Sequence, residues 1–275
     1  MSDMKLDEAQ KQVLRDAMLA AGRVIMDVRA AGGDHKFKGD GSPVTLADTR
    51  AEVILLKALS EAAPEITVVA EEAAEAGHIP KATRVFFLVD PLDGTKEFIR
   101  GGTDFTVNIG LIVDKNPVFG LIYVPATGAF YEGEAGQGAW RRQLDCAVVE
   151  TCQPKEKTPI SVRDADRENL MAVASRSHRA EETNAWLTAH NVKDTVSAGS
   201  SLKFCLLAEG KADVYPRHGP TMEWDTAAGH AILSAAGGRV ETLDGKTFGY
   251  GKYDQTRPYL NPGFIAYGAN IRKMF

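Results

Sequence analysis

The stretch of sequence that decides the fold is Val85-Phe86-Phe87-Leu88-Val89, followed directly by Asp90-Pro91-Leu92-Asp93-Gly94-Thr95. The first part is apolar at every position, which is typical of a strand that is buried on both faces. The second part places two carboxylates, a glycine and a hydroxyl at the end of that strand. Oxygen ligands of this kind are those that Mg²⁺ prefers. The stretch therefore predicts a buried strand that ends in a metal site.

Helices are expected on the N-terminal side of this strand. Apolar residues between positions 14 and 28 recur at helical spacing and predict an amphipathic helix that ends near Gly32-Gly33. A second helix is expected to begin at Thr45-Leu46-Ala47-Asp48, where the threonine and the aspartate have the spacing of a capping box, and to end before Pro64.

Further strands are expected at residues 66–70, 106–113 and 118–124. The last two are joined by Asp114-Lys115-Asn116-Pro117, which predicts a hairpin. The glycines that follow are interpreted as turns, namely Gly133, Gly136 and Gly138. Residues 1–152 are therefore predicted to form an N-terminal α+β domain with an antiparallel sheet.

A second domain is expected to follow the polar segment 152–159, which contains two prolines. Beyond it, strand-like and helical runs alternate as in an α/β layer. The strand-like runs lie at 170–174, 212–215 and 239–243, and the helical runs lie at 181–190, from 200 or 201, and from 225. Residues 153–275 are therefore predicted to form a C-terminal α/β domain that carries the substrate-binding residues.

Composition limits the classes of function. With 44% hydrophobic and 25% charged residues in a chain of 275, the protein is expected to be globular. Its net charge of -5 argues against binding of nucleic-acid polymers, which usually requires a basic surplus. Its three cysteines have no C-x-x-C spacing and no clustered histidines, which argues against a disulfide framework or a zinc site and favours a reducing cytoplasm.

Neither a signal peptide nor a membrane-spanning run is expected. Residues 1–14 are of mixed charge, and no stretch reaches the roughly 18 apolar residues that a transmembrane helix needs. The protein is therefore expected to be soluble and cytoplasmic, either free or bound peripherally to the cytoplasmic face of the inner membrane. The sequence leaves open whether it is a monomer or a homodimer.

Four acids in separate segments are candidates for one site. Asp90 and Asp93 end the apolar strand, Glu71 follows the run at 66–70, and Asp225 precedes a helical run. If these acids converge, repulsion among their charges raises their pKa values unless cations neutralise them. Two Mg²⁺ ions would balance the charge, clamp a phosphoryl group and activate a water. The pattern therefore predicts a metal-dependent phosphatase.

Each acid also has an ordinary structural interpretation. Asp93-Gly94 alone is a turn dipeptide, Asp225 alone is a good helix N-cap, and Glu71-Glu72 alone is a solvated surface pair. Asp48 completes a capping box with Thr45, which by spacing alone is its more common role. Only convergence of the acids in space separates the two interpretations.

Two motifs resemble the signatures of a known family. Residues 90–98, D-P-L-D-G-T-K-E-F, and residues 224–229, W-D-T-A-A-G, are similar to the signature motifs of the inositol monophosphatase superfamily of Mg²⁺-dependent, lithium-sensitive phosphatases. The continuation at 95–98, the run G-S-S-L-K-F-C at 199–205 and the run Y-P-R at 215–217 resemble one branch of it, the CysQ-type 3′(2′),5′-bisphosphate nucleotidases.

This resemblance spans roughly residues 38–264 and implies both a fold and residue roles. The fold would be α+β, with the αβαβα layers of the inositol-monophosphatase/fructose-bisphosphatase-like sugar phosphatases. The ligands of two or three Mg²⁺ ions would be Glu71, Asp90, the carbonyl of Leu92, Asp93 and Asp225. Asp48 would orient the Thr95 hydroxyl, so that this pair activates the attacking water. Substrate contacts would come from Glu71, Leu92, Asp93, Gly94, Thr95, His178, Ser200, Lys203, Arg217 and Asp225.

The resemblance also implies a reaction, the hydrolysis of the 3′-phosphate of adenosine 3′,5′-bisphosphate (PAP) to AMP and phosphate in sulfur assimilation. The 2′,5′ isomer and the sulfated nucleotide PAPS are further expected substrates. Lys203 and Arg217 would supply fixed cations for the second phosphate, which an inositol phosphate lacks. The alternative enzyme is an inositol or sugar monophosphatase. A non-catalytic nucleotide sensor is the alternative outside enzymes, and Thr95 with Asp48 argues against it, because a pure binder needs no water-activating pair.

Overall fold

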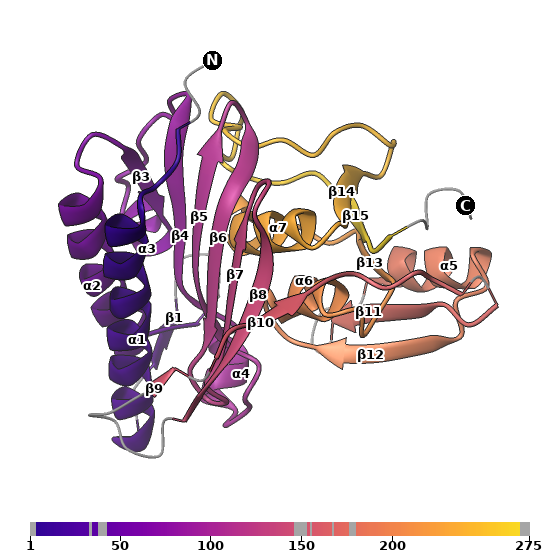
Figure 1. The fold of residues 1–275 in the computed structure, drawn as a ribbon, viewed down its shortest axis with the longest axis horizontal. Helices are drawn as coiled ribbons and strands as arrows, with labels where there is room; N and C mark the ends of the chain where they lie inside the picture. Colours follow the sequence, from indigo (N-terminus) through magenta and orange to yellow (C-terminus); the bar gives the residue numbers. More distant parts are fainter. Residues whose placement is uncertain are drawn as a thin grey trace.

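The computed structural model of the chain describes residues 4–32, 35–37, 43–145, 153–154, 156–166, 168–175 and 180–269. These residues form layers in the order helices, sheet, helices, sheet, helix (Figure 1). The α+β class and the αβαβα layering expected from the sequence are therefore confirmed.

The first layer consists of the long helices α1 (Glu8–Ala30) and α2 (Leu46–Ala62). Each begins with a capping box, which satisfies N–H groups that a helix start leaves unpaired. The short strands β1 (His35–Phe37) and β2 (Pro43–Thr45) form a separate antiparallel pair before α2. Both helices end where the sequence predicts, α1 before the Gly32 turn and α2 before Pro64.

The second layer is an eight-stranded sheet in the order β10-β8-β7-β6-β5-β4-β3, with β9 paired to β8. Its strands are β3 (Thr67–Ala70), β4 (Val85–Asp93), β5 (Thr106–Val113), β6 (Asn116–Val124), β7 (Ala129–Glu134), β8 (Gly138–Asp145), β9 (Gln153–Pro154) and β10 (Thr158–Ile160). The sheet therefore extends beyond residue 152, and the division into two domains stays a prediction.

One pair of neighbours differs from the expected antiparallel sheet. β3 and β4 pair in parallel, whereas the other neighbouring strands of this sheet pair antiparallel. The connection between β3 and β4 is long and contains the short helix α3 (Glu71–Glu75), so the chain can return to the same edge and run in the same direction.

The remaining layers belong to the second half of the chain. Helices α6 (Leu202–Ala208) and α7 (Glu223–Ala235) lie between the two sheets, and α5 (Glu181–Ala189) lies beyond the second sheet (Figure 1). The second sheet has the order β12-β11-β13-β15-β14. Its strands are β11 (Met171–Ser175), β12 (Asp194–Ala198), β13 (Val214–Arg217), β14 (Arg239–Thr242) and β15 (Phe264–Tyr267).

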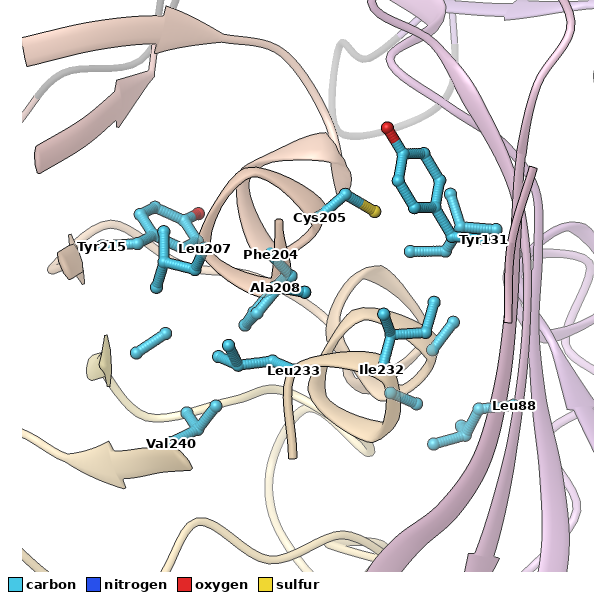
Figure 2. Close-up of a cluster of buried hydrophobic side chains, with 14 of the residues drawn as sticks. Leu88, Tyr131, Phe204, Cys205, Leu207, Ala208, Tyr215, Ile232, Leu233 and Val240 are labelled. Atoms are coloured by element: carbon cyan, nitrogen blue, oxygen red, sulfur yellow. The ribbon is translucent and has the colours of Figure 1, made fainter. Parts of the chain in front are cut away.

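Alternate side chains of each central strand join different hydrophobic clusters. In β4, Phe87 and Val89 pack in the cluster with α1 and α2, whereas Phe86 and Leu88 pack in the cluster between the two sheets. Both faces of β4 are therefore buried, as its continuous apolar sequence predicts. Figure 2 shows the cluster between the sheets, in which Leu88 of the first sheet lies on the opposite side from residues of the second.

Three glycines allow α7 to lie close to the first sheet. Gly110, Gly120 and Gly133 are direct neighbours across β5, β6 and β7. A Cβ added at these positions would lie 2.7, 2.4 and 2.5 Å, respectively, from atoms of α7. Gly133 was expected in a turn and instead lies within β7, because the approach of α7 leaves no room for a side chain there.

Several strands were not expected from the sequence, namely β1, β2, β7, β8, β9, β10, β12 and β15. The hairpin of β5 and β6 is confirmed, with Asp114 and Lys115 at φ of +50° and +66° in its turn. Among the described helices, none has both the length and the hydropathy needed to cross a membrane.

Candidate active site

The end of β4 turns sharply into the short helix α4 (Thr95–Ile99). The pairing of β4 with β5 shifts between Asp90 and Asp93, and the Asp90 carboxylate accepts a hydrogen bond from the Leu92 N–H at 3.0 Å. Gly94 follows with φ of +95°, and a Cβ there would lie 2.8 Å from a backbone carbonyl oxygen. The turn therefore requires glycine, and it brings Asp93 and Thr95 to the same cavity.

Asp48 divides its carboxylate between the start of α2 and Thr95. Its Oδ2 accepts hydrogen bonds from the N–H and the hydroxyl of Thr45, both at 2.7 Å. Its Oδ1 accepts a hydrogen bond from the Thr95 hydroxyl at 3.1 Å. The same hydroxyl lies 3.2 Å from the Leu92 carbonyl oxygen. The capping box and the contact with Thr95 therefore coexist, because each uses a different oxygen.

A buried carboxylate holds the start of α3. Glu52, which is 6% exposed, accepts hydrogen bonds from the N–H groups of Glu72 at 2.8 Å and Ala73 at 2.9 Å. Glu71 is the first residue of α3 and lines the cavity, so Glu52 fixes the backbone beside it. Glu71, Glu72 and Glu75 bring carboxylate oxygens within 4.8 Å of one another.

The start of α7 repeats the arrangement seen in α2. Asp225 is the third residue of the helix, and its Oδ2 accepts a hydrogen bond from the Met222 N–H at 2.8 Å. The Asn261 amide donates to the Met222 carbonyl oxygen at 2.7 Å and to the Thr226 hydroxyl at 3.1 Å. The N-cap is therefore Met222, and Asp225 reaches back to it while also lining the cavity.

Polar side chains of β5 hold the turn before α6. The Ser201 hydroxyl donates to Asn108 Oδ1 at 2.6 Å and lies 2.8 Å from the Thr106 hydroxyl, which in turn donates to the Ser200 hydroxyl at 3.2 Å. Lys203 is 5% exposed, and its Nζ donates to the Ser200 carbonyl oxygen at 2.6 Å. Because β5 pairs with β4, this network fixes Lys203 relative to the acids of β4.

These segments surround a cavity of about 360 Å³, which is at the lower end of the volumes of small-molecule sites. The predicted site residues that line it are Glu71, Asp93, Gly94, Thr95, Ser200, Lys203, Arg217 and Asp225. Three others, Asp48, Asp90 and Leu92, are each 1% exposed. Asp48 and the Leu92 carbonyl oxygen contact the Thr95 hydroxyl, and Asp90 contacts the Leu92 N–H. The predicted residue His178 lies outside the described residues.

Burial raises the pKa values of the acids, and repulsion between neighbouring carboxylates adds to this rise for Asp90 and Asp93. Burial, together with the charges of Glu71, Asp93 and Asp225, raises the pKa of Asp90 well above its ordinary value. Burial and the charge of Asp225 raise the pKa of Asp93 to about 7, and burial raises the pKa of Asp225 to about 6. Burial lowers the pKa of Lys203 to about 8, although Asp93 opposes this shift. The structure therefore brings these charged groups into one electrostatic environment.

The donor set fits a hard divalent cation. Carboxylate and carbonyl oxygens are the ligands that Mg²⁺ prefers. The raised pKa values of Asp90, Asp93 and Asp225 mean that carboxylates gathered here are unfavourable without further positive charge. The assignment of individual ligands stays a prediction.

Other residues of the cavity were not found from the sequence. The charged ones among them are Glu75, Lys96, Glu97 and Arg257. Glu75 lies one helical turn after Glu71, and Lys96 and Glu97 directly follow Thr95, so their positions beside predicted residues were a usable signal. Nothing near Arg257 in the sequence indicates a site.

Comparison with known proteins gives one family. The model of the inositol monophosphatase family matches residues 6–270 of the chain. The chain is also 44% identical over 246 residues to the 3′(2′),5′-bisphosphate nucleotidase CysQ of Salmonella typhimurium, and this match covers 89% of the chain and 94% of that protein.

Solved structures give a consistent result. CysQ from Bacteroides thetaiotaomicron, a bacterial member of the inositol monophosphatase family, matches with a TM-score of 0.78 and 38% identity, covering 95% of this chain and 97% of that one. The inositol monophosphatase from Anabaena (Nostoc) sp. PCC 7120 matches with a TM-score of 0.71 and 25% identity, covering 94% of this chain and 90% of that one. The similarity therefore extends over almost the whole chain.

Proposed function

The chain belongs to the inositol monophosphatase family, and we propose that it is a Mg²⁺-dependent 3′(2′),5′-bisphosphate nucleotidase that hydrolyses the 3′-phosphate of PAP to give AMP and phosphate. One observation carries the proposal: the acids Glu71, Asp93 and Asp225 line the same cavity as the cations Lys203 and Arg217. The acids suit metal-assisted cleavage of one phosphate, and the cations suit binding of a second.

Enzymes of this family depend on a metal. In this chain, two or three Mg²⁺ ions would be held by Glu71, Asp90, the Leu92 carbonyl, Asp93 and Asp225. When bound, the ions supply Lewis-acid stabilisation of the charge on the phosphoryl group. The proposed ligands come from β4, α3 and α7, and the hydrogen bonds of Glu52 and Asn261 support this proposal by fixing the starts of both helices.

Thr95 and Asp48 would move the proton of the attacking water. When the Thr95 hydroxyl donates to Asp48 Oδ1, its lone pairs can accept a hydrogen bond from a water. As the water oxygen bonds to phosphorus, its proton passes to Thr95 Oγ1 and the Thr95 proton passes to Asp48 Oδ1. The bond between phosphorus and the ribose 3′-oxygen breaks, and that oxygen takes up a proton from solvent.

Lys203 and Arg217 would distinguish a bisphosphate from a monophosphate. The Arg217 side chain donates to the carbonyl oxygens of Gly219 at 3.1 Å and Pro220 at 3.0 Å, which holds the guanidinium at the cavity. Cations that are already fixed lose little side-chain entropy when they bind a phosphate. An inositol monophosphate has no second phosphate and gains nothing from them.

Substrate comparison tests the proposal. Phosphate release would be measured from PAP, inositol 1-phosphate and fructose 1,6-bisphosphate, each with and without Mg²⁺ and Li⁺. We expect the highest kcat/KM for PAP, dependence on Mg²⁺ and inhibition by Li⁺. Asp90→Asn should abolish the activity, whereas Asp16→Asn, at an exposed position on α1, should keep it.

Other outcomes would favour the alternatives. A higher kcat/KM for inositol 1-phosphate would favour the monophosphatase, and binding of PAP without phosphate release would favour the sensor. Hydrolysis of PAPS and of the 2′,5′ isomer belongs to the same proposal and can be measured in parallel. A cytoplasmic location, with or without peripheral membrane binding, and a monomeric or dimeric state stay predictions.

A further inference from the structure

One residue that lines the cavity is an exposed arginine from the C-terminal part of the chain. Arg257 lines the cavity together with Asp225 and Leu260, and its side chain is exposed to solvent. Arg257 therefore reaches the acidic site although it lies at the surface.

The loop that carries Arg257 is fastened at both ends to the start of α7. At its beginning, the N–H groups of Gly251 and Lys252 donate to the buried carboxylate of Glu223 at 2.7 and 2.9 Å. At its end, Asn261 donates to the Met222 carbonyl oxygen at 2.7 Å. Glu223 and Met222 flank the helix start that also presents Asp225, so the loop and this acid are held by the same element.

Hydrogen bonds within the loop fix the position of Arg257. Its carbonyl oxygen accepts hydrogen bonds from the Gln255 side chain at 2.9 Å and from the Leu260 N–H at 3.2 Å. Tyr259, with φ of +62°, donates its N–H to the Lys252 carbonyl oxygen at 2.9 Å, and its hydroxyl donates to the Pro80 carbonyl oxygen. A loop braced in this way fixes the backbone of Arg257 beside the cavity.

The other cations of the cavity are placed differently. Lys203 is buried and donates to the Ser200 carbonyl oxygen, so its charge lies among the acids. Arg217 uses Nε and Nη2 for backbone carbonyl oxygens. Lys96 lies next to Thr95, at the end of the cavity where hydrolysis is proposed. Of these side chains, Arg257 is the exposed one, on a segment separate from the proposed water-activating pair.

We propose that Arg257 is a specificity-determining residue that binds the phosphate of the nucleotide that is not hydrolysed. A planar guanidinium can bind two phosphate oxygens at once, which suits a terminal phosphate held apart from the scissile one by the ribose. This inference rests on the proposed nucleotidase function, and it assigns to a loop residue part of the selectivity that Lys203 and Arg217 were expected to provide.

The test compares two substrates with the same scissile ester. Values of kcat/KM for PAP and for adenosine 3′-monophosphate would be measured with the full-length protein, Arg257→Ala, Arg257→Lys and the control Arg23→Ala, at an exposed position on α1. Arg257→Ala should lower the value for PAP by about 10- to 100-fold, mainly through KM, and leave that for the monophosphate unchanged. Arg257→Lys should lose less, and Arg23→Ala should match the unmodified protein.

A binding measurement separates recognition from turnover. AMP with its phosphate on the 5′-oxygen keeps the second phosphate and lacks the scissile one, so calorimetric titration should show weaker binding to Arg257→Ala by a similar factor. If Arg257→Ala leaves the ratio of kcat/KM for PAP to that for the monophosphate unchanged, the role of Arg257 is overturned and the proposed function is not. A full-length protein without preference for PAP would overturn the proposed function and this inference together.

Discussion

The Thr95 hydroxyl donates a hydrogen bond to Asp48 Oδ1 at 3.1 Å, although the two residues are 47 positions apart. The contact joins the turn after β4 to the start of α2. The other oxygen of the same carboxylate holds Thr45, so the first turn of a long helix fixes the direction in which the acid faces Thr95. A proton acceptor placed in this way needs no rearrangement before it can act.

Removal of the Thr95 hydroxyl should stop catalysis without weakening substrate binding. Thr95→Ala is expected to lower kcat for PAP by about 10²- to 10⁴-fold with little change in KM, because the proposed acceptor of the water proton is lost. Thr95→Ser should keep most of the activity. Steady-state kinetics would measure both, with the exposed Thr49→Ala as control. Activity of Thr95→Ala equal to that of the control would refute the proposed proton path.

Replacement of Asp90 should stabilise the metal-free protein. Asp90→Asn replaces a carboxylate that is buried and is repelled by the charges of Glu71, Asp93 and Asp225. The Tm of the metal-free protein should therefore rise. Saturating Mg²⁺ should raise the Tm of the unmodified protein by roughly 5–10 °C and leave that of Asp90→Asn unchanged. Thermal unfolding with and without Mg²⁺ would measure this, and an equal Mg²⁺ shift in both proteins would exclude Asp90 as a ligand.

Loss of Glu52 should weaken metal binding from a distance. Glu52→Ala leaves the N–H groups of Glu72 and Ala73 without their acceptor, so the unfolding free energy should fall by about 1–3 kcal/mol. The Mg²⁺ concentration for half-maximal activity should rise about tenfold or more, because Glu71 is no longer held in place. Glu61→Gln, at an exposed position later in α2, serves as control. Unchanged Mg²⁺ dependence in Glu52→Ala would limit Glu52 to a structural role.

Acid should destabilise the protein in part through His230. Burial lowers the pKa of His230 to about 3, so the ring, which contacts the Tyr250 hydroxyl at 3.1 Å, stays neutral in the folded protein. Between about pH 3 and about pH 6.5, His230 is protonated in the unfolded chain but not in the folded protein. Its contribution to the free energy of unfolding is therefore full above about pH 6.5 and is lost as the pH falls.

The size of this effect can be measured by urea unfolding at pH 7 and pH 5 in metal-free buffer. The unmodified protein should lose about 2 kcal/mol more than His230→Gln between the two pH values. The exposed His78→Gln should behave like the unmodified protein. Equal losses in all three proteins would show that His230 does not contribute.

A methyl group at Gly120 should disturb both packing and metal binding. The added Cβ would lie 2.4 Å from the Ala228 carbonyl oxygen, so α7 must move away from the sheet. Gly120→Ala is expected to lower the unfolding free energy by about 1–3 kcal/mol and to raise the Mg²⁺ requirement, since Asp225 moves with its helix. Gly249→Ala, where a Cβ meets only ordinary contacts, should change neither quantity.

The elements that the sequence predicts well carry local signals. The capping box of Thr45 and Asp48 and the hairpin turn at Asp114 each depend on a few adjacent residues, and the structure has both. Continuous apolar character identified β4 because both of its faces are buried.

The elements that the sequence missed depend on distant partners. β12 is mostly exposed and polar, so it gives little apolar pattern. Gly133 indicates a turn by itself, and only the presence of α7 explains a glycine inside β7. The parallel pairing of β3 with β4 depends on the path of the connection and not on the residues of either strand.

The same distinction applies to the candidate site. The acids of β4 stand in one contiguous motif, so their role could be predicted, whereas Glu52 and Arg257 act through contacts with residues far along the chain. The two-sided use of Asp48 could be anticipated as a requirement, but only coordinates show which oxygen goes to which partner. The role of His178 stays a prediction.

The cavity takes its principal acids and its outermost cation from different layers of the molecule. Asp90 and Asp93 belong to β4, whose side chains pack against hydrophobic clusters on both faces of the sheet, whereas Arg257 is an exposed residue on a surface loop. Substitutions in this loop could therefore change which phosphate ester is bound, while the acids proposed to hold the metal stay the same. A change of substrate preference therefore meets the fewest packing constraints at the rim of the cavity.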